Sequence, residues 1–275
     1  MDERRILIDC GEGTQMQLRK YKVKFQRLQY IFISHMHGDH FLGIFGLLTS
    51  MNLTGRTTAL KVFGPAGLKE IILFLFEKSF VRLAYTLEFV EIGSAEKKLI
   101  LEDDAIEIFS FPVKHRVPTW GFLFHQKEKK RRIDKLMIEK HKLSIQEMKD
   151  LKAGKDIVRG ESLIPNKALS LPPVSALRYA YCADTIYHPE ICKWIENSDL
   201  VYHEATFCEK DRKRAKETMH STGLDAANIA LASGAKKLLI GHFSARYTSS
   251  EVILNEARTI FFNTTDVRDG DTFVL

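Results

Sequence analysis

The stretch His35-Met36-His37-Gly38-Asp39-His40 is the most informative part of this sequence. It follows the apolar residues 30–33, whose aromatic and β-branched side chains predict a buried strand, and it precedes residues 41–48, which predict the start of a buried helix. Imidazole nitrogen and carboxylate oxygen are ligands of borderline-soft divalent metals such as zinc. The alternative is a polar loop whose histidines only cap the helix, but so dense a cluster favours a metal site.

The spacing within this stretch suggests two ions. His35 and His37 are two residues apart, so in an extended segment their side chains point the same way and can bind one ion. Asp39 and His40 follow at the predicted helix start and can face a second ion.

The composition indicates a soluble intracellular protein. A chain of 275 residues with 45% hydrophobic content fits a single large α/β domain spanning residues 1–275. No apolar run reaches the roughly 18–20 residues that cross a bilayer, and the N-terminus lacks the apolar stretch of a signal peptide. The four cysteines are scattered, which suits a reducing cytoplasm better than a disulfide scaffold.

Positive charge is concentrated in one segment. Residues 127–159 hold twelve Lys or Arg against six Asp or Glu, a net charge of +6 that equals the net charge of the whole chain. Two short helical patterns, at about 134–141 and 144–153, precede a Pro- and Ser-rich tail, so we expect residues 127–175 to form an inserted, projecting arm. Such a segment suits a polyanionic partner. The alternative is a solvated charged loop without a partner.

An alternation of strands and helices is predicted over the rest of the chain. We expect strands at about residues 5–10, 30–33, 60–63, 85–92, 97–101, 105–112, 120–126, 179–183, 200–202, 237–241 and 272–275. Helices are expected at about residues 14–22, 41–52, 68–80, 189–197, 224–233 and 250–261.

Polar side chains capable of binding metal recur where these strands end. The strand-end residues are His35, His115, Asp184, Glu204 and His242. Loops of this kind gather at one edge of a layered α/β fold, so the side chains should converge. With the rest of the first motif they supply seven potential ligands, enough for two ions that share a carboxylate: His35, His37, Asp39, His40, His115, Asp184 and His242. Asp9 ends another strand, where it either hydrogen-bonds a ligating imidazole or caps a turn.

Taken together, these motifs resemble the ribonuclease Z family of the metallo-β-lactamase superfamily. The H-x-H-x-D-H motif alone indicates the superfamily, whereas His203-Glu204-Ala205-Thr206 and His220-Ser221-Thr222 are specific to the family. Residues 7–15 and Phe243-Ser244-x-Arg246-Tyr247 also fit its pattern.

The resemblance implies an αββα sandwich with two Zn²⁺ ions per subunit at one edge. The ligands of one ion would be His35, His37 and His115, those of the other Asp39, His40 and His242, with Asp184 between them. Asp39 would take a proton from water, and His220, paired with Glu204, would protonate the leaving oxygen.

The implied activity is removal of the 3′ trailer from precursor tRNA, which leaves a 3′-hydroxyl on the tRNA and a 5′-phosphate on the trailer. Arg246 would contact the scissile phosphate, and the arm would grip tRNA within a homodimer. The cations expected to contact the tRNA backbone are Lys129, Lys130, Arg131 and Arg132.

Two departures from the family pattern leave other functions open. Family members have a further strand pair before the segment equivalent to Arg5, and the arm lacks the family's Gly-Pro-rich motif. The alternatives are another dinuclear phosphodiesterase or esterase of the superfamily, or a truncated RNA-binding homologue without activity.

Overall fold

Two β-sheets face each other in the computed structural model, which describes residues 5–129, 131–173 and 175–275. The first sheet is parallel, in the order β1-β2-β3-β4. Its strands are β1 (Arg5–Ile8), β2 (Leu28–Phe32), β3 (Leu60–Pro65) and β4 (Leu87–Ile92).

The second sheet is mixed, in the order β15-β14-β13-β12-β7-β6-β5. It is antiparallel from β5 to β12 and parallel from β12 to β15. Its strands are β5 (Lys98–Glu102), β6 (Ile106–Val113), β7 (Thr119–Gln126), β12 (Arg178–Cys182), β13 (Leu200–Glu204), β14 (Leu238–Gly241) and β15 (Thr264–Asp266).

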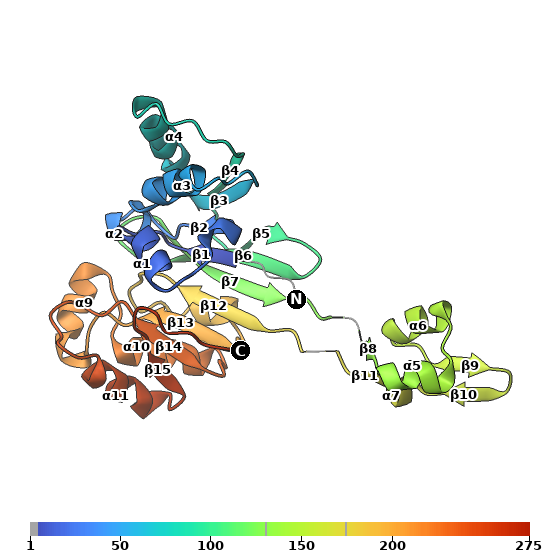
Figure 1. The fold of residues 1–275 in the computed structure, drawn as a ribbon. Helices are drawn as coiled ribbons and strands as arrows, with labels where there is room; N and C mark the ends of the chain where they lie inside the picture. The colour runs from blue at the N-terminus through green and yellow to red at the C-terminus, as the bar shows by residue number, and fades with distance from the viewer. Residues whose placement is uncertain (1–4, 130, 174) are drawn as a thin grey trace.

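Helices cover the outer face of each sheet (Figure 1). On the first sheet they are α1 (Thr14–Lys20), α2 (Gly38–Phe41), α3 (Ile44–Leu53) and α4 (Leu68–Lys78), with a 3₁₀ turn, η1 (Phe25–Arg27), before β2. On the second sheet they are α8 (Ile191–Trp194), η2 (Glu209–Asp211), α9 (Arg212–Thr218), α10 (Gly223–Ala232) and α11 (Glu251–Ile260). Within the part of the chain that the structure describes, no helix is both long and apolar enough to span a bilayer.

Three apolar clusters hold the layers together. Phe32 and Phe63 stack at a ring-centroid distance of 4.5 Å between the sheets and contact Phe122 of the second sheet. Their strand neighbours Ile31 and Val62 point to the opposite face and pack under the helices, as the two-residue period of a strand requires. A third cluster joins the second sheet to α8, α10 and α11. These clusters separate four layers, which confirms the predicted αββα sandwich.

Several predicted elements differ in the structure. The predicted strand at 272–275 is wrong: these residues form no strand, and Val274 is 92% exposed. The edge of the sheet is instead occupied by β15, whose polar sequence Thr-Thr-Asp gave no strand signal. The helix expected over 41–52 is divided into α2 and α3, and the helix expected over 189–197 is only the short α8.

The basic segment forms a small module held away from the sandwich (Figure 1). Its elements are β8 (Arg132–Ile133), α5 (Lys135–His141), α6 (Ile145–Lys152), β9 (Ile157–Arg159), β10 (Ser162–Ile164), α7 (Asn166–Leu169) and β11 (Ser170–Leu171). It has its own apolar centre, formed by Leu143, Leu151, Ile157 and Leu169. The sequence predicted both longer helices but neither strand pair.

Two glycines allow the loop after β1 to lie against the His35–His40 motif. A Cβ atom on Gly11 would lie 2.0 Å from the carbonyl oxygen of Asp39, and one on Gly43 would lie 1.8 Å from the carbonyl oxygen of Gly11. The backbone N–H of Cys10 donates to the carbonyl of His40 at 2.7 Å. This close approach fixes the motif to β1.

Candidate metal centre and catalytic residues

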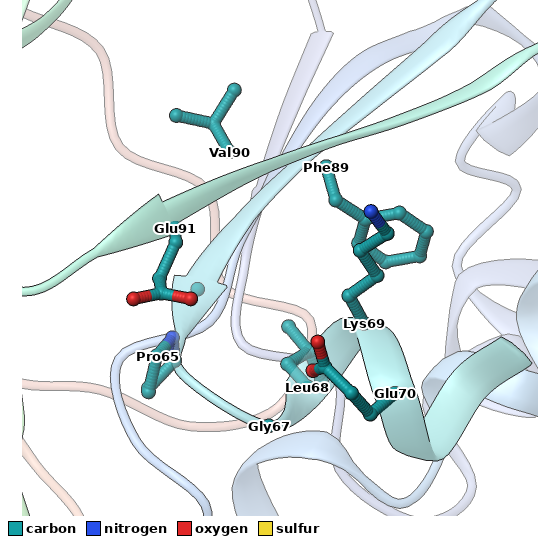
Figure 2. Close-up of a pocket in the computed structure, with 9 residues that line it drawn as sticks. Pro65, Gly67, Leu68, Lys69, Glu70, Phe89, Val90 and Glu91 are labelled. Carbon is teal, nitrogen blue, oxygen red and sulfur yellow. The ribbon is translucent and has the colours of Figure 1, made fainter.

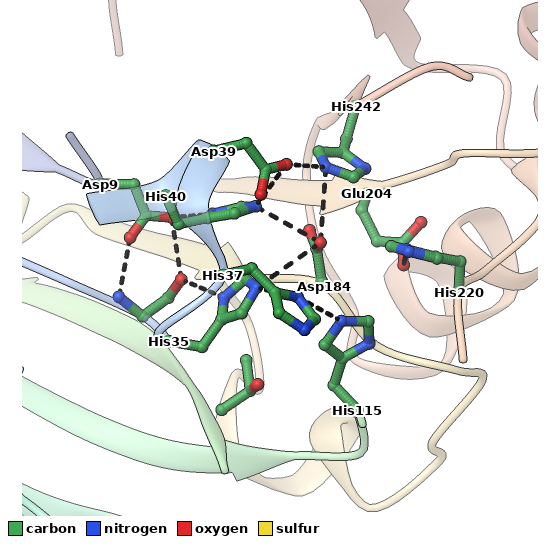
Figure 3. A network of polar contacts seen from close by, with 12 residues as sticks. Asp9, His35, His37, Asp39, His40, His115, Asp184, Glu204, His220 and His242 are labelled. Carbon is green, nitrogen blue, oxygen red and sulfur yellow. Dashed lines mark hydrogen bonds and ion pairs between the residues drawn. The ribbon is translucent and has the colours of Figure 1, made fainter. Parts of the chain in front are cut away.

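The carboxyl ends of four strands meet at one edge of the sandwich. The motif 35–40 follows β2, His115 follows β6, Asp184 follows β12 and His242 follows β14. Figure 3 shows that their side chains point toward one another. All seven predicted metal ligands are therefore brought together, although they span more than 200 residues of sequence.

One group of donors consists of three histidines and Asp184. The Nδ1 atom of His37 lies 3.0 Å from Nε2 of His35 and 3.2 Å from Nε2 of His115. Asp184 Oδ2 lies 3.9 Å from Nε2 of His35. One ligand atom from each of the four residues lies within 4.8 Å of the others, a spacing that suits a single metal ion.

A second group consists of Asp39, His40 and His242, whose ligand atoms meet the same spacing. Asp184 Oδ2 lies 3.4 Å from Nε2 of both His40 and His242. Asp184 thus lies between the two groups, where a bridging carboxylate would be expected. His220 is adjacent, since it forms a further group with Asp184 and His242.

The ligand imidazoles are held by their other nitrogen atoms. His115 Nδ1 donates to the carbonyl oxygen of Met219 at 2.9 Å, and His40 Nδ1 donates to the Asp9 carboxylate at 2.8 Å. Since these partners only accept hydrogen bonds, Nδ1 carries a proton in each ring, and Nε2, which has the lone pair when the ring is neutral, faces the cluster. His40 Nε2 is buried and has no hydrogen-bond partner among the described residues. Converging nitrogen lone pairs beside two carboxylates fit divalent metal ions.

Asp9 supports the cluster from behind. Its carboxylate accepts hydrogen bonds from the backbone N–H of Ser34 at 2.7 Å, from the Ser34 hydroxyl at 2.9 Å and from the Tyr181 hydroxyl at 2.9 Å. With the bond from His40, these contacts decide between the two alternatives for Asp9: it hydrogen-bonds an imidazole of the cluster.

Burial and charge set the protonation of the cluster. Burial lowers the pKa of His35 to about 3, so its ring is neutral. Burial opposes charge at His40 as well, but the nearby carboxylates of Asp184 and Asp9 outweigh it and raise the pKa of His40 to about 10. A hydrogen bond to His242 lowers the pKa of Asp39 to about 2. Burial would raise the pKa of Asp184, yet the surrounding imidazoles bring it well below the usual value. Both carboxylates are therefore anionic.

A buried carboxylate orients His220. Glu204, at the end of β13, is 1% exposed and accepts a hydrogen bond from His220 Nδ1 at 2.8 Å. It also accepts from the backbone N–H groups of Thr185 and Thr206, each at 3.0 Å, and from the Thr206 hydroxyl at 2.7 Å. With Nδ1 bound to Glu204, the Nε2 atom of His220 is the one available for proton transfer.

Three residues that contact the cluster or Asp9 were not predicted from the sequence to do so: Thr206, Tyr181 and Met219. The Thr206 hydroxyl lies 2.9 Å from His242 Nδ1, so it fixes the His242 ring as well as Glu204. Thr206 is the last residue of the His-Glu-Ala-Thr motif, and this position could have indicated a role for it. A carbonyl such as that of Met219 has no signature in sequence.

The predicted substrate-binding residues lie apart from the cluster. Arg246 is exposed on the loop that follows β14, four residues after His242. Lys129 and Arg132 are exposed where the arm begins, whereas Arg131 donates to the Ser170 hydroxyl at 2.8 Å. Lys130 lies outside the described residues.

A separate hollow of about 520 Å³ lies between β3, β4 and the start of α4 (Figure 2). Its charged side chains are Lys69, Glu70 and Glu91. None of the predicted site residues lines it, so the donor cluster remains the candidate site.

The fold and the donor cluster together define the class of protein. Residues 4–143, about half of the chain, match the family model described as "Beta-lactamase superfamily domain".

Similarity to individual proteins narrows this class. The chain is 45% identical to a protein of Bacteroides thetaiotaomicron named "Ribonuclease Z", over 98% of this chain and 85% of that protein. It is 43% identical to a "Ribonuclease Z" of Porphyromonas gingivalis, over 93% of this chain and 84% of that protein. The crystal structure of human tRNase Z, short form, superimposes with a TM-score of 0.69 at 25% identity, over 98% of this chain and 88% of that chain. The chain belongs to the ribonuclease Z family.

Proposed function

We propose that this protein is a metal-dependent endoribonuclease that removes the 3′ trailer from precursor tRNA. The observation that carries the proposal is the buried Glu204–His220 pair beside seven convergent metal-binding side chains, in a chain of this family. The products would be a tRNA with a 3′-hydroxyl and a trailer with a 5′-phosphate.

The proposed cofactor is two Zn²⁺ ions per subunit. His35, His37 and His115 would hold one ion, and Asp184 would be shared with the other. The other ligands of the second ion would be Asp39, His40 and His242. When bound, such ions supply Lewis acidity toward the phosphate and lower the pKa of water to about 7.

The protein's own residues move the protons. The side chain of Asp39 is 68% exposed. It would accept the proton of the attacking water as the water oxygen bonds to phosphorus. The bond between phosphorus and the 3′ oxygen breaks, and His220 Nε2 would give its proton to that oxygen. Glu204 would hold the His220 ring in this orientation through the hydrogen bond to Nδ1.

Binding of the tRNA is assigned to exposed cations. Arg246 would contact the scissile phosphate, and the run Lys129–Arg132 would contact backbone phosphates without reading the bases. Lys129 and Arg132 present their charge to solvent most directly, since Arg131 is bonded to Ser170. We propose residues 127–175 as the arm inserted into one metallo-β-lactamase-like domain.

A homodimer is proposed on the basis of α4. Its inner residues Leu68 and Ile72 are buried, but Ile71, Phe74 and Leu75 on its outer face are 39%, 56% and 39% exposed. An apolar helix face of this kind suits a self-complementary contact with a second copy.

The four cysteines, free thiols in the described structure, suit a cytoplasmic location.

Two substrates tested side by side check the proposed function. The purified protein, with its metal content measured, is given a precursor tRNA and a chromogenic phosphodiester, and the RNA ends are sequenced. Cleavage at the trailer junction with the predicted ends supports the proposal. Hydrolysis of the small ester alone would favour a small-substrate phosphodiesterase, and RNA binding without hydrolysis of either would favour a non-catalytic homologue.

A further inference from the structure

A pocket of about 200 Å³ opens directly beside His220 and outside the donor cluster. Ile186 and Tyr187, from the loop that follows β12, form one wall, and Ala215 and Lys216 of α9 form another. His220 borders both spaces, because it lines this pocket and its ring centroid lies 4.9 Å from that of His115. A group seated in the pocket would therefore lie next to the proposed proton donor.

One cation at the pocket rim is outside any ion pair among the described residues. Arg212 and Asp225 both line it, but they form an ion pair at 3.0 Å, and Arg212 also binds Glu209. Arg212 is thus shared between two carboxylates and is not free to bind a ligand. Lys216 is exposed, and none of the described acidic side chains forms an ion pair with it. The ammonium group of Lys216 therefore stands at the pocket rim outside any ion pair, although it also acts electrostatically on Glu209.

The remaining walls suit a planar apolar group. The Tyr187 side chain is 42% exposed, and in the described structure no other ring stacks on it and its hydroxyl makes no hydrogen bond. Ile186 and Ala215 add apolar surface beside it. An exposed aromatic ring next to a cation is the combination with which proteins bind unpaired nucleotides, the base on the ring and the phosphate on the cation.

We propose that this pocket binds the unpaired nucleotide that carries the leaving 3′ oxygen, with its base on Tyr187 and a phosphate near Lys216. The assignment rests on the proposed function. A proton donor must lie within about 2.6–3.2 Å of the atom that it protonates. The ribose bearing that oxygen must therefore be adjacent to His220, and the pocket is the space that His220 lines outside the donor cluster.

The test combines variants of Tyr187 with abasic substrates. Wild type, Tyr187→Ala and Tyr187→Phe are compared by kcat/KM on a precursor tRNA that is intact, abasic at the last tRNA nucleotide or abasic at the first trailer nucleotide. Loss of stacking should lower cleavage of the intact substrate about 5- to 150-fold in Tyr187→Ala, and Tyr187→Phe should restore it. On the substrate that is abasic at the last tRNA nucleotide, Tyr187→Ala should cause little further loss.

The assignment would be overturned if Tyr187→Ala and the missing base of the last tRNA nucleotide lowered kcat/KM by independent factors that multiply. It would also be overturned if Tyr187→Ala were coupled only to the base of the first trailer nucleotide. Metal content and the thermal unfolding midpoint identify any variant that is merely misfolded, and Tyr187→Phe then carries the comparison. If wild type fails to cleave precursor tRNA, both the proposed function and this pocket assignment fall. If wild type cleaves but shows no coupling, only the pocket assignment falls.

A second comparison addresses the phosphate. Lys216→Ala should reduce the salt dependence of precursor binding by roughly 0.7 in the log–log slope, the value for one phosphate of a single strand. Lys213→Ala is the matched control, because Lys213 is an exposed lysine of the same helix that does not line the pocket. Equal changes in both variants would reduce Lys216 to part of a general surface charge and contradict the phosphate contact.

Discussion

Thr206→Val isolates the hydroxyl that connects the proposed catalytic pair, Glu204 and His220, with the proposed metal ligand His242. In the structure this hydroxyl lies 2.7 Å from the Glu204 carboxylate and 2.9 Å from His242 Nδ1. Its proton goes to the carboxylate, so its oxygen accepts the hydrogen bond from His242. Valine has nearly the same shape and removes both contacts at once.

The expected magnitude follows from what remains. Glu204 keeps the backbone N–H groups of residues 185 and 206 and the bond from His220, so it loses one hydrogen bond to a charged group, worth about 1.5–3 kcal/mol. Removing a group that orients a ligand histidine typically costs 10- to 100-fold in metal affinity. The His242 side chain is 28% exposed, so water can replace the lost acceptor in part. We therefore expect a loss near tenfold.

Competition with a chromophoric chelator measures the affinity and the number of ions, and urea unfolding of the metal-free protein measures stability. The Thr206→Val variant should release one ion before the other, because Thr206 touches a ligand of only one donor group. Thr206→Ser keeps the hydroxyl and is the matched control. Wild-type affinity for both ions in Thr206→Val would refute the reasoning, and so would an equal loss in Thr206→Ser.

Three further variants test the assigned roles. Asp184→Ala should reduce bound metal from two ions to one or none and abolish cleavage; retention of both ions, measured by metal analysis, would remove Asp184 from the shared position. His220→Ala should keep both ions while cleavage slows roughly 10²- to 10⁴-fold in single-turnover assays, and metal loss would instead make it a ligand. Replacing Lys129 and Arg132 with Ala, with Arg131 retained, should lower the log–log salt slope of precursor binding by at most about 2. An unchanged slope would mean that these side chains are only hydrated and contact no phosphate.

The donor cluster could be predicted from sequence because its signals are local and its chemistry is uncommon. Strands of four or five residues end one to three residues before His35, Asp184 and His242, and parallel neighbours place such ends at one edge. Histidines at these positions have few other uses. The continuous apolar run 30–33 likewise predicted a buried strand, and in the structure Ile31 and Phe32 pack on its opposite faces.

What could not be predicted depends on tertiary context. Thr206 and Tyr181 are common residue types, and only the fold brings the Tyr181 hydroxyl to Asp9, 172 residues earlier in the chain. The predicted strand at 272–275 had a suitable apolar pattern, but the pairing surface beside β14 is taken by β15. In the arm, strands of two or three residues are too short to show any period.

The backbone at the site indicates that the fold itself holds the donors together. Asp9, Met219 and His242 all have left-handed backbones, with φ of 56°, 59° and 61°. Such conformations cost non-glycine residues of order 1–3 kcal/mol each and persist only where the surrounding structure imposes them. Each of the three fixes an imidazole of the cluster: Asp9 binds His40, the carbonyl of Met219 binds His115, and His242 is itself a proposed ligand. Packing in the apolar clusters on either side of the second sheet supplies the free energy that can offset this backbone strain. Substitutions that loosen those clusters should therefore weaken metal binding as well as stability, even when they lie far from the donors.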